Sequence, residues 1–303
     1  MSKIIWTTIL LTLTLSVYSQ QSVQTIADIN FYADVTANAA LADSRLRGHE
    51  QLYLAIDQWL RSDEYQDSQL DQLSYISVKR PDDDSFALLT WQVLDKDEAY
   101  HYYGFLRMAD GTIHELKSDD QLNYKDLPYE TLDSEHWYGA LYYNMLATEV
   151  NGSTAYLLFG FDGHEAFDHR KVMDVLYFEN GNPMFGAPIF ELPNTSRRQE
   201  MANRVLVEYS NDAAVSLNYN EQLQMVTHDH LISRMGRRPG QGPTMVPDGS
   251  YIGYKWDDNK WTYIDKVYDQ VSTTPPSDNR KRTESKGLFG KDNTAPKAKK
   301  SRD

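Results

Sequence analysis

The chain has 303 residues, a formal net charge of −14 and no cysteine. The missing cysteines exclude disulfides, a thiol nucleophile and any Cys-ligated metal, so burial of a core must stabilise the fold. The mean hydropathy of −0.61 indicates that the chain is not an integral membrane protein built from apolar helices.

The two ends of the chain differ from the middle. Lys3 precedes an apolar run, Ile4–Val17, and small residues follow it, which predicts a signal peptide over residues 1–19. Residues 272–303 are rich in Pro, Ser and Lys and carry a net charge of +5, which predicts a disordered basic tail. We therefore expect an exported protein, periplasmic or extracellular, whose tail can touch an anionic surface.

The part of the chain between these ends is strongly acidic. When the +1 of the signal and the +5 of the tail are removed from the overall −14, residues 20–271 carry −20. Nucleic acid is excluded as a partner because phosphate binding needs a basic face.

Residues 20–70 are predicted to be helical. Apolar residues recur at spacings of three and four from Val35 to Leu60 and form one stripe. Gly48 interrupts the stripe, so the pattern allows two helices with a break at this point. We expect this segment to dock on a sheet.

Residues 71–235 are predicted to form the main β domain, because short alternating runs here are separated by turn residues. Asp110-Gly111, Asn151-Gly152 and Asn180-Gly181 are typical of tight hairpin turns. The pattern of Trp137–Val150 alone is ambiguous, and the Asn151-Gly152 pair that follows it favours a hairpin. The other expected strands are Tyr75–Lys79, Ser85–Leu94, Ala99–Met108, Thr112–Leu116, Thr154–Phe161, Val172–Phe178, Pro183–Phe190, Val205–Tyr209, Val215–Tyr219 and Leu223–His228.

Residues 236–271 are predicted to be a loop and a C-terminal β-hairpin module. The loop, Arg234–Pro247, is rich in Gly and Pro and carries Arg237 and Arg238. The hairpin pairs Tyr251–Trp256 with Trp261–Val267. The predicted fold class is thus mainly β: an antiparallel, hairpin-rich meander, either sandwich or barrel-like, with an N-terminal helical segment.

Three segments carry a resemblance to other proteins: Ala155–Gly163, Lys171–Phe190 and Pro247–Ile264, about 47 residues together. They resemble a group of exported, β-rich bacterial proteins that have no established activity. The resemblance implies an envelope or extracellular protein built from hairpins, and it assigns no catalytic residue.

The best metal candidates are His228 and His230. Residues two apart in a strand share a face, so both imidazoles can reach one cation. A zinc site needs one or two further ligands from elsewhere in the chain. The alternative is a strand end with two hydrogen-bonded histidines.

A second polar cluster follows the strand that ends near Phe161. It contains carboxylates and imidazoles suited to general acid–base chemistry or to an oxygen-rich cation site: Asp162, His164, Glu165, Asp168 and His169. Its spacing is not that of a calcium-binding loop. Loops also carry polar residues for purely structural reasons.

Aromatic runs around Tyr102-Tyr103, Trp137-Tyr138 and Tyr142-Tyr143 suit either a sugar or peptide platform or the packed face of a sheet. The chain has no Gly-x-Ser-x-Gly elbow, Walker loop, dinucleotide fingerprint or His-Glu-x-x-His helix, and no cofactor is implied. These patterns favour a non-catalytic protein that binds an envelope polysaccharide or an envelope protein. The alternative is a metal-assisted envelope hydrolase.

Overall fold

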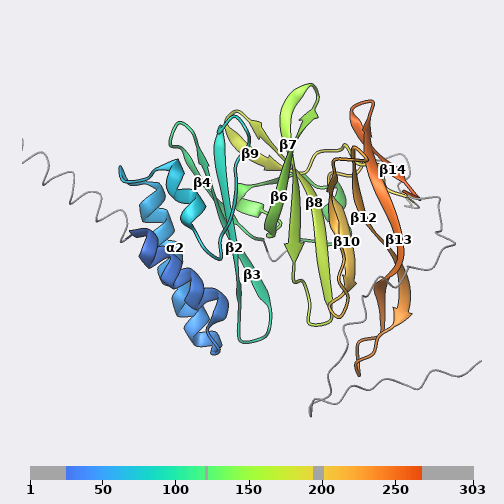
Figure 1. Cartoon of the computed structure of the whole chain (residues 1–303), viewed down its shortest axis with the longest axis horizontal. Helices are drawn as coiled ribbons and strands as arrows, with labels where there is room; N and C mark the ends of the chain where they lie inside the picture. Colours follow the sequence, from blue (N-terminus) through green and yellow to red (C-terminus); the bar gives the residue numbers. More distant parts are fainter. Residues whose placement is uncertain (1–24, 120–121, 194–200, 268–303) are drawn as a thin grey trace, which may run out of the picture. The chain divides into compact units, whose positions relative to one another are not determined.

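The computed structural model describes residues 25–119, 122–193 and 201–267 (Figure 1). The predicted signal peptide and basic tail lie outside the described residues. Within these ranges, an N-terminal helical segment is followed by three antiparallel sheets. The sheets are open and packed face to face, so the mainly β prediction is confirmed in its sandwich form and not in its barrel-like form.

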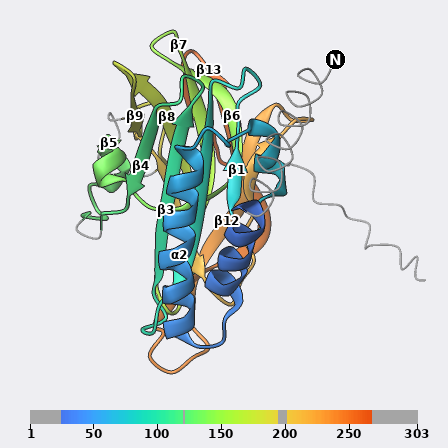
Figure 2. The same ribbon diagram turned by 90° about the vertical axis from the view of Figure 1, so that its left-hand side faces the viewer.

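The N-terminal segment forms two helices that lie against the first sheet (Figure 2). One covers residues 25–38 and the other, α2, is Ala42–Leu60. The sequence pattern allowed a break between helices at Gly48. In the structure the two helices are instead separated at residues 39–41. A Cβ on Gly48 would lie 2.7 Å from Val35 Cγ1, so this glycine lets the two helices approach closely. Neither of these two helices is long and apolar enough to span a membrane.

The helix-side sheet has the order β1-β2-β3-β4, and it is buried on both faces at its centre. In β2, Leu88 faces the central sheet, whereas Leu89 and Trp91 face the helices, because neighbouring side chains of a strand alternate. This explains why β2 begins with an apolar run, Phe86–Leu89, in place of an alternating pattern. The strands are β1 (Ser77–Lys79), β2 (Phe86–Leu94), β3 (Tyr100–Met108) and β4 (Ile113–Lys117).

The central sheet has the order β5-β9-β8-β7-β6, and one edge of β8 holds two further strands in succession. The first half of β8 pairs with β10, and its last residues pair with β9. Within β7, Leu157 and Leu158 point into the two opposite cores. The strands are β5 (Leu132–Asp133), β6 (Leu141–Val150), β7 (Ser153–Asp162), β8 (Asp168–Glu179), β9 (Asn182–Phe185) and β10 (Val205–Ser210).

Tight turns join these strands as expected. Asn151 and Gly152 have φ of 52° and 75°, and Asn180 and Gly181 have φ of 52° and 83°. Two consecutive positive φ values define the turn whose twist matches a two-residue hairpin. The Asn151-Gly152 turn fixes the β6–β7 pairing, which the sequence pattern of Trp137–Val150 alone left ambiguous.

The C-terminal sheet has the order β11-β12-β13-β14. The predicted loop at Arg234–Pro247 is shorter in the structure, because Arg234 pairs with Thr244 and Met235 with Pro243. Residues 236–242 are therefore the turn of a long hairpin, and the C-terminal hairpin belongs to the same sheet as β12. The strands are β11 (Leu217–Asn220), β12 (Met225–Met235), β13 (Pro243–Asp257) and β14 (Lys260–Ile264).

A buried ion pair connects β8 to the segments around it. Arg204 Nε lies 3.3 Å from Asp174 Oδ1, and neither side chain is exposed. The guanidinium also donates to the backbone oxygens of Leu127 (2.6 Å), Glu130 (3.1 Å) and Phe185 (3.1 Å). Burial raises the pKa of the Asp174 carboxyl, and the positive charge of Arg204 opposes that rise.

Candidate functional site

The polar cluster predicted after Phe161 lies at the corner where β7 ends and β8 begins. Asp162 and Arg170 are directly opposite each other in the β7–β8 register, so their side chains share one face. Tyr138 donates its hydroxyl proton to Asp162 Oδ2 at 2.6 Å, and the His164 backbone N–H donates to Oδ1 at 2.8 Å. The buried carboxylate therefore has donors on both oxygens.

Arg170 extends this network toward β10. Its Nε and Nη2 donate to Glu208 Oε2 at 2.9 and 2.6 Å, and the guanidinium lies 3.9 Å above the Tyr124 ring. His164 Nε2 lies 3.5 Å from Glu165 Oε1 and 3.8 Å from Glu208 Oε2. The corner thus brings one guanidinium and one imidazole together with three carboxylates. The carboxylates are Asp162, Glu165 and Glu208.

The structure brings together three of the five residues proposed from the sequence: Asp162, His164 and Glu165. His169 points to the opposite face of β8, where its ring lies 5.2 Å from that of Phe161. Asp168 accepts a hydrogen bond from Thr244 Oγ1 at 2.6 Å. His169 leaves the set because β8 already begins at Asp168, and strand alternation sends His169 to the face opposite Arg170, while Asp168 is engaged by Thr244.

The protonation states in this corner follow from burial. Burial raises the pKa of the Tyr138 hydroxyl, and the nearby Asp162 charge raises it further. Burial likewise lowers the pKa of His164, with the Arg170 charge acting in the same direction. At neutral pH the tyrosine is therefore a donor and the imidazole is neutral. Asp162 and His164 line a cavity of about 280 Å³ beside Tyr124 and Tyr138.

His228 and His230 lie in β12, on either side of Asp229. The β12–β13 register shifts between Asp229 and Leu231, which marks a bulge. His228 is 5% exposed and its Nδ1 lies 2.9 Å from the Asp229 backbone oxygen. His230 Nδ1 lies 2.8 Å from Asp248 Oδ2 at the surface. Throughout the described ranges, no three His, Asp or Glu side chains are grouped so that they could hold a metal ion.

The aromatic runs serve mainly as core. Trp137 and Tyr142 are fully buried, and Trp137 Nε1 donates to the Tyr142 hydroxyl at 3.1 Å. Tyr102 is also buried, and its hydroxyl accepts the Gly163 N–H at 2.6 Å. Only Tyr100, Tyr103 and Tyr143 of these runs keep part of their surface accessible.

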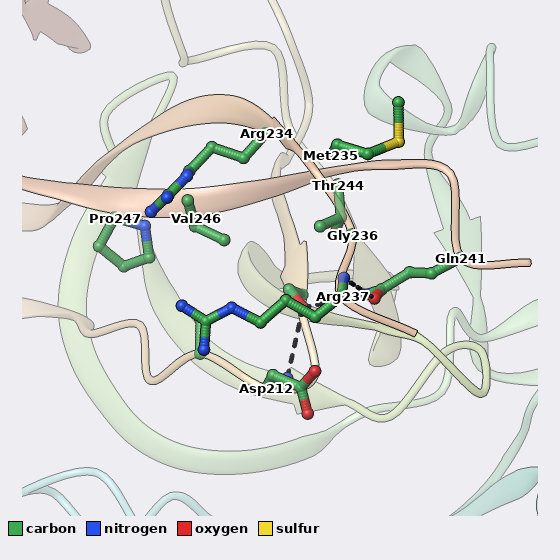
Figure 3. Close-up of a pocket in the computed structure, with 11 residues that line it drawn as sticks. Asp212, Arg234, Met235, Gly236, Arg237, Gln241, Thr244, Val246 and Pro247 are labelled. Carbon is green, nitrogen blue, oxygen red and sulfur yellow. Dashed lines mark hydrogen bonds between the residues drawn. The ribbon is translucent and has the colours of Figure 1, made fainter. Parts of the chain in front are cut away.

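A second cavity, of about 210 Å³, lies beside the β12–β13 turn (Figure 3). We call it the arginine cavity, since Arg234 and Arg237 line it and extend toward the same side as Val246 and Pro247. The buried Gln241 holds the turn that carries these arginines. Its Oε1 accepts the backbone N–H of Arg237 at 3.0 Å, and its Nε2 donates to Ser210 Oγ at 3.2 Å.

The charges at this turn are not balanced. Arg238 forms an ion pair with Asp212, whereas Arg234 and Arg237 have no carboxylate partner within the part of the chain that the structure describes. The sequence predicts Arg237 and Arg238 to be loop residues and gives no site at this position. The sequence did contain an indication of this site: three arginines fall within the five residues 234–238, in a part of the chain that is otherwise strongly acidic.

Comparison with known proteins found no matching family model, no matching curated protein and no matching solved structure. Arguments about function therefore rest on the residues of this chain alone.

Proposed function

We propose that this protein is an exported, non-catalytic binding protein and that the arginine cavity binds an anionic polysaccharide of the cell envelope. The observation that carries the proposal is the pair Arg234 and Arg237. Both line one cavity without a carboxylate partner in the described chain, in a protein whose body is otherwise strongly acidic.

The chemistry of the cavity suits an oxyanion on a sugar chain. A guanidinium presents a planar set of donors that matches a carboxylate or phosphate group. Val246 and Pro247 add an apolar surface beside the arginines, suited to the apolar face of a sugar ring. The acidic surface elsewhere repels a polyanion, so attraction is concentrated at this end of the C-terminal sheet.

The turn is also held in place before a ligand arrives. Gln241 joins the backbone of Arg237 and Arg238 to Ser210, which is the last residue of β10. A cation carried on a fixed turn loses less conformational entropy on binding than one on a flexible loop.

The corner around Asp162 supports binding over hydrolysis. Asp162 accepts a hydrogen bond on each oxygen, from the Tyr138 hydroxyl and from the His164 backbone N–H, so these groups hold the carboxylate in place within the protein. Tyr138 has a raised pKa and keeps its proton, so it is not a nucleophile at neutral pH.

The test is binding of the exported protein to immobilised polygalacturonate, with dextran as the neutral polymer and polyphosphate as the phosphate polymer. We expect binding to polygalacturonate but not to dextran. The affinity for polygalacturonate is expected to fall about tenfold between low and high salt concentration, because screening shortens the range of the attraction. Comparison with polyphosphate distinguishes carboxylate from phosphate as the preferred group.

The variant Arg234→Gln/Arg237→Gln is expected to weaken binding about tenfold or more, since each lost charge-assisted hydrogen bond contributes roughly 1.5–3 kcal/mol. Lys255→Gln is the matched control, because Lys255 is an exposed cation of β13 in the same sheet. Equal binding of dextran, or an equal loss in both variants, would contradict the proposal.

A further inference from the structure

A third hollow, of about 370 Å³, lies between the edge strand β10 and the C-terminal sheet. Its walls are largely apolar: Val205 and Val207 come from β10, while Leu231, Ile252 and Tyr254 come from β12 and β13. This volume falls in the range of about 300–1,000 Å³ that is typical of sites for small molecules. The hollow is separate from the arginine cavity and shares no lining residue with it.

His228 is the polar group that matters in this hollow. Its ring lies almost parallel to that of Tyr254, with the ring centroids 6.1 Å apart. Nδ1 lies 2.9 Å from the backbone oxygen of Asp229, and a carbonyl oxygen can only accept, so Nδ1 carries the proton. In the neutral imidazole the lone pair is then on Nε2.

Nε2 of His228 is buried and has no hydrogen-bond partner among the residues that the structure describes. His228 shares a face of β12 with Val226, a residue of the core between the central and C-terminal sheets, so its ring is directed toward the space between these sheets and lines the hollow. A buried acceptor left without a donor is costly, and a molecule that supplies the donor removes that cost.

The charged groups around the hollow leave this imidazole neutral. Burial lowers the pKa of His228, the adjacent His230 lowers it further, and the Asp229 carbonyl and carboxylate oppose this in part. Glu208 and Arg204 also line the hollow, but each is already engaged, Glu208 by Arg170 and Arg204 by Asp174.

We propose that this hollow binds a small neutral molecule that combines an apolar ring with one hydroxyl group, and that the hydroxyl donates its proton in a hydrogen bond to Nε2 of His228. The apolar walls receive the ring, and the single acceptor fixes its orientation. A metal ion is a poorer occupant, because a zinc site needs at least three protein ligands and the described chain groups no such set here.

Phenol and anisole are the probes, because they share one ring and differ in whether the oxygen carries a proton. Binding is measured with the full exported protein by titration calorimetry and by the NMR shifts of ring protons in the hollow. We expect phenol to bind about tenfold more tightly than anisole, which is the ratio that one good hydrogen bond gives. In His228→Phe the ratio is expected to fall to about one.

His136→Gln is the control, since His136 is an exposed histidine that lies outside the hollow, and it is expected to keep the phenol preference. The ¹⁵N shift of His228 Nε2 in the unmodified protein gives a second measurement that does not depend on a variant folding. It is expected to move on addition of phenol and not of anisole. Equal affinities for the two probes, or an unmoved Nε2 signal, would overturn the proposal.

Discussion

His49 is expected to make the fold sensitive to mild acid. The residue lies in α2 against the helix-side sheet, and its Nδ1 accepts a hydrogen bond from Trp91 Nε1 at 3.2 Å. Its ring centroid lies 3.9 Å from that of Tyr103. Burial, with the charge of His101 acting in the same direction, lowers the pKa of His49 from 6.5 to about 4.

A fall in pH destabilises the folded state, because the unfolded state takes up the proton at His49 first. The unfolded chain binds a proton at His49 near pH 6.5, whereas the folded chain binds it only near pH 4. Stability from this group is therefore complete above pH 6.5 and is lost as the pH falls from 6.5 toward 4. The loss is roughly 3 kcal/mol in total, and about 2 kcal/mol of it occurs between about pH 7 and pH 5.

The assay is urea unfolding followed by tryptophan fluorescence at about pH 7 and about pH 5, for the wild type and for His49→Gln. A glutamine can still accept from Trp91 but does not titrate, so the variant is expected to lose about 2 kcal/mol less than the wild type over this interval. Other acid-sensitive groups are common to both proteins and cancel in the difference. His136→Gln is the contrasting variant: the hydrogen bond to Asp133 raises the pKa of this exposed histidine, so its removal is expected to enlarge the loss of stability between about pH 7 and pH 5 and not to reduce it. Equal losses in the wild type and His49→Gln would refute the reasoning.

Arg204→Met is expected to destabilise the fold by about 3–5 kcal/mol in urea unfolding, because it leaves the Asp174 charge buried without a partner. Arg204→Met/Asp174→Leu is expected to recover part of this loss, and a double variant less stable than the single one would argue against the ion pair. Gly163→Ala places a Cβ 2.1 Å from Tyr100 Cδ2 and is expected to lower the melting temperature through about 1–3 kcal/mol of overpacking. In a Tyr100→Ala background, which removes the ring that the new methyl group would meet, Gly163→Ala is expected to cost much less, and an equal drop in both backgrounds would mean that the Tyr100 contact is not responsible. Zinc added after EDTA is expected to leave the melting temperature unchanged, since His228 and His230 bond to separate partners, and a rise of several degrees would contradict this.

The strands were largely predictable because their signals are local. The Asn-Gly pairs at residues 151–152 and 180–181 fix two hairpins, and β2 shows its double burial in the apolar run Phe86–Leu89. The position of β10 beside β8 has no local signal, because the two strands are joined through residues 180–204 and pair over a long distance in the sequence.

The site was harder to predict than the fold. The five residues of the Asp162 cluster appeared to belong to one loop, and the start of β8 at Asp168 decides which of them meet. The arginine cavity depends on Gln241 reaching Ser210, 31 positions earlier in the chain. Neither residue type indicates such a contact, so spacing alone does not locate this cavity.

The double burial of the central sheet has a consequence for fragments of the chain. Its Leu158 face needs the helix-side sheet, which precedes it in the sequence, and its Leu157 face needs the C-terminal sheet, which follows it. A truncated protein that lacks either neighbour would expose one of these faces to water, and exposed apolar patches of that kind promote aggregation. Shortened versions that cut between the sheets are therefore expected to be insoluble.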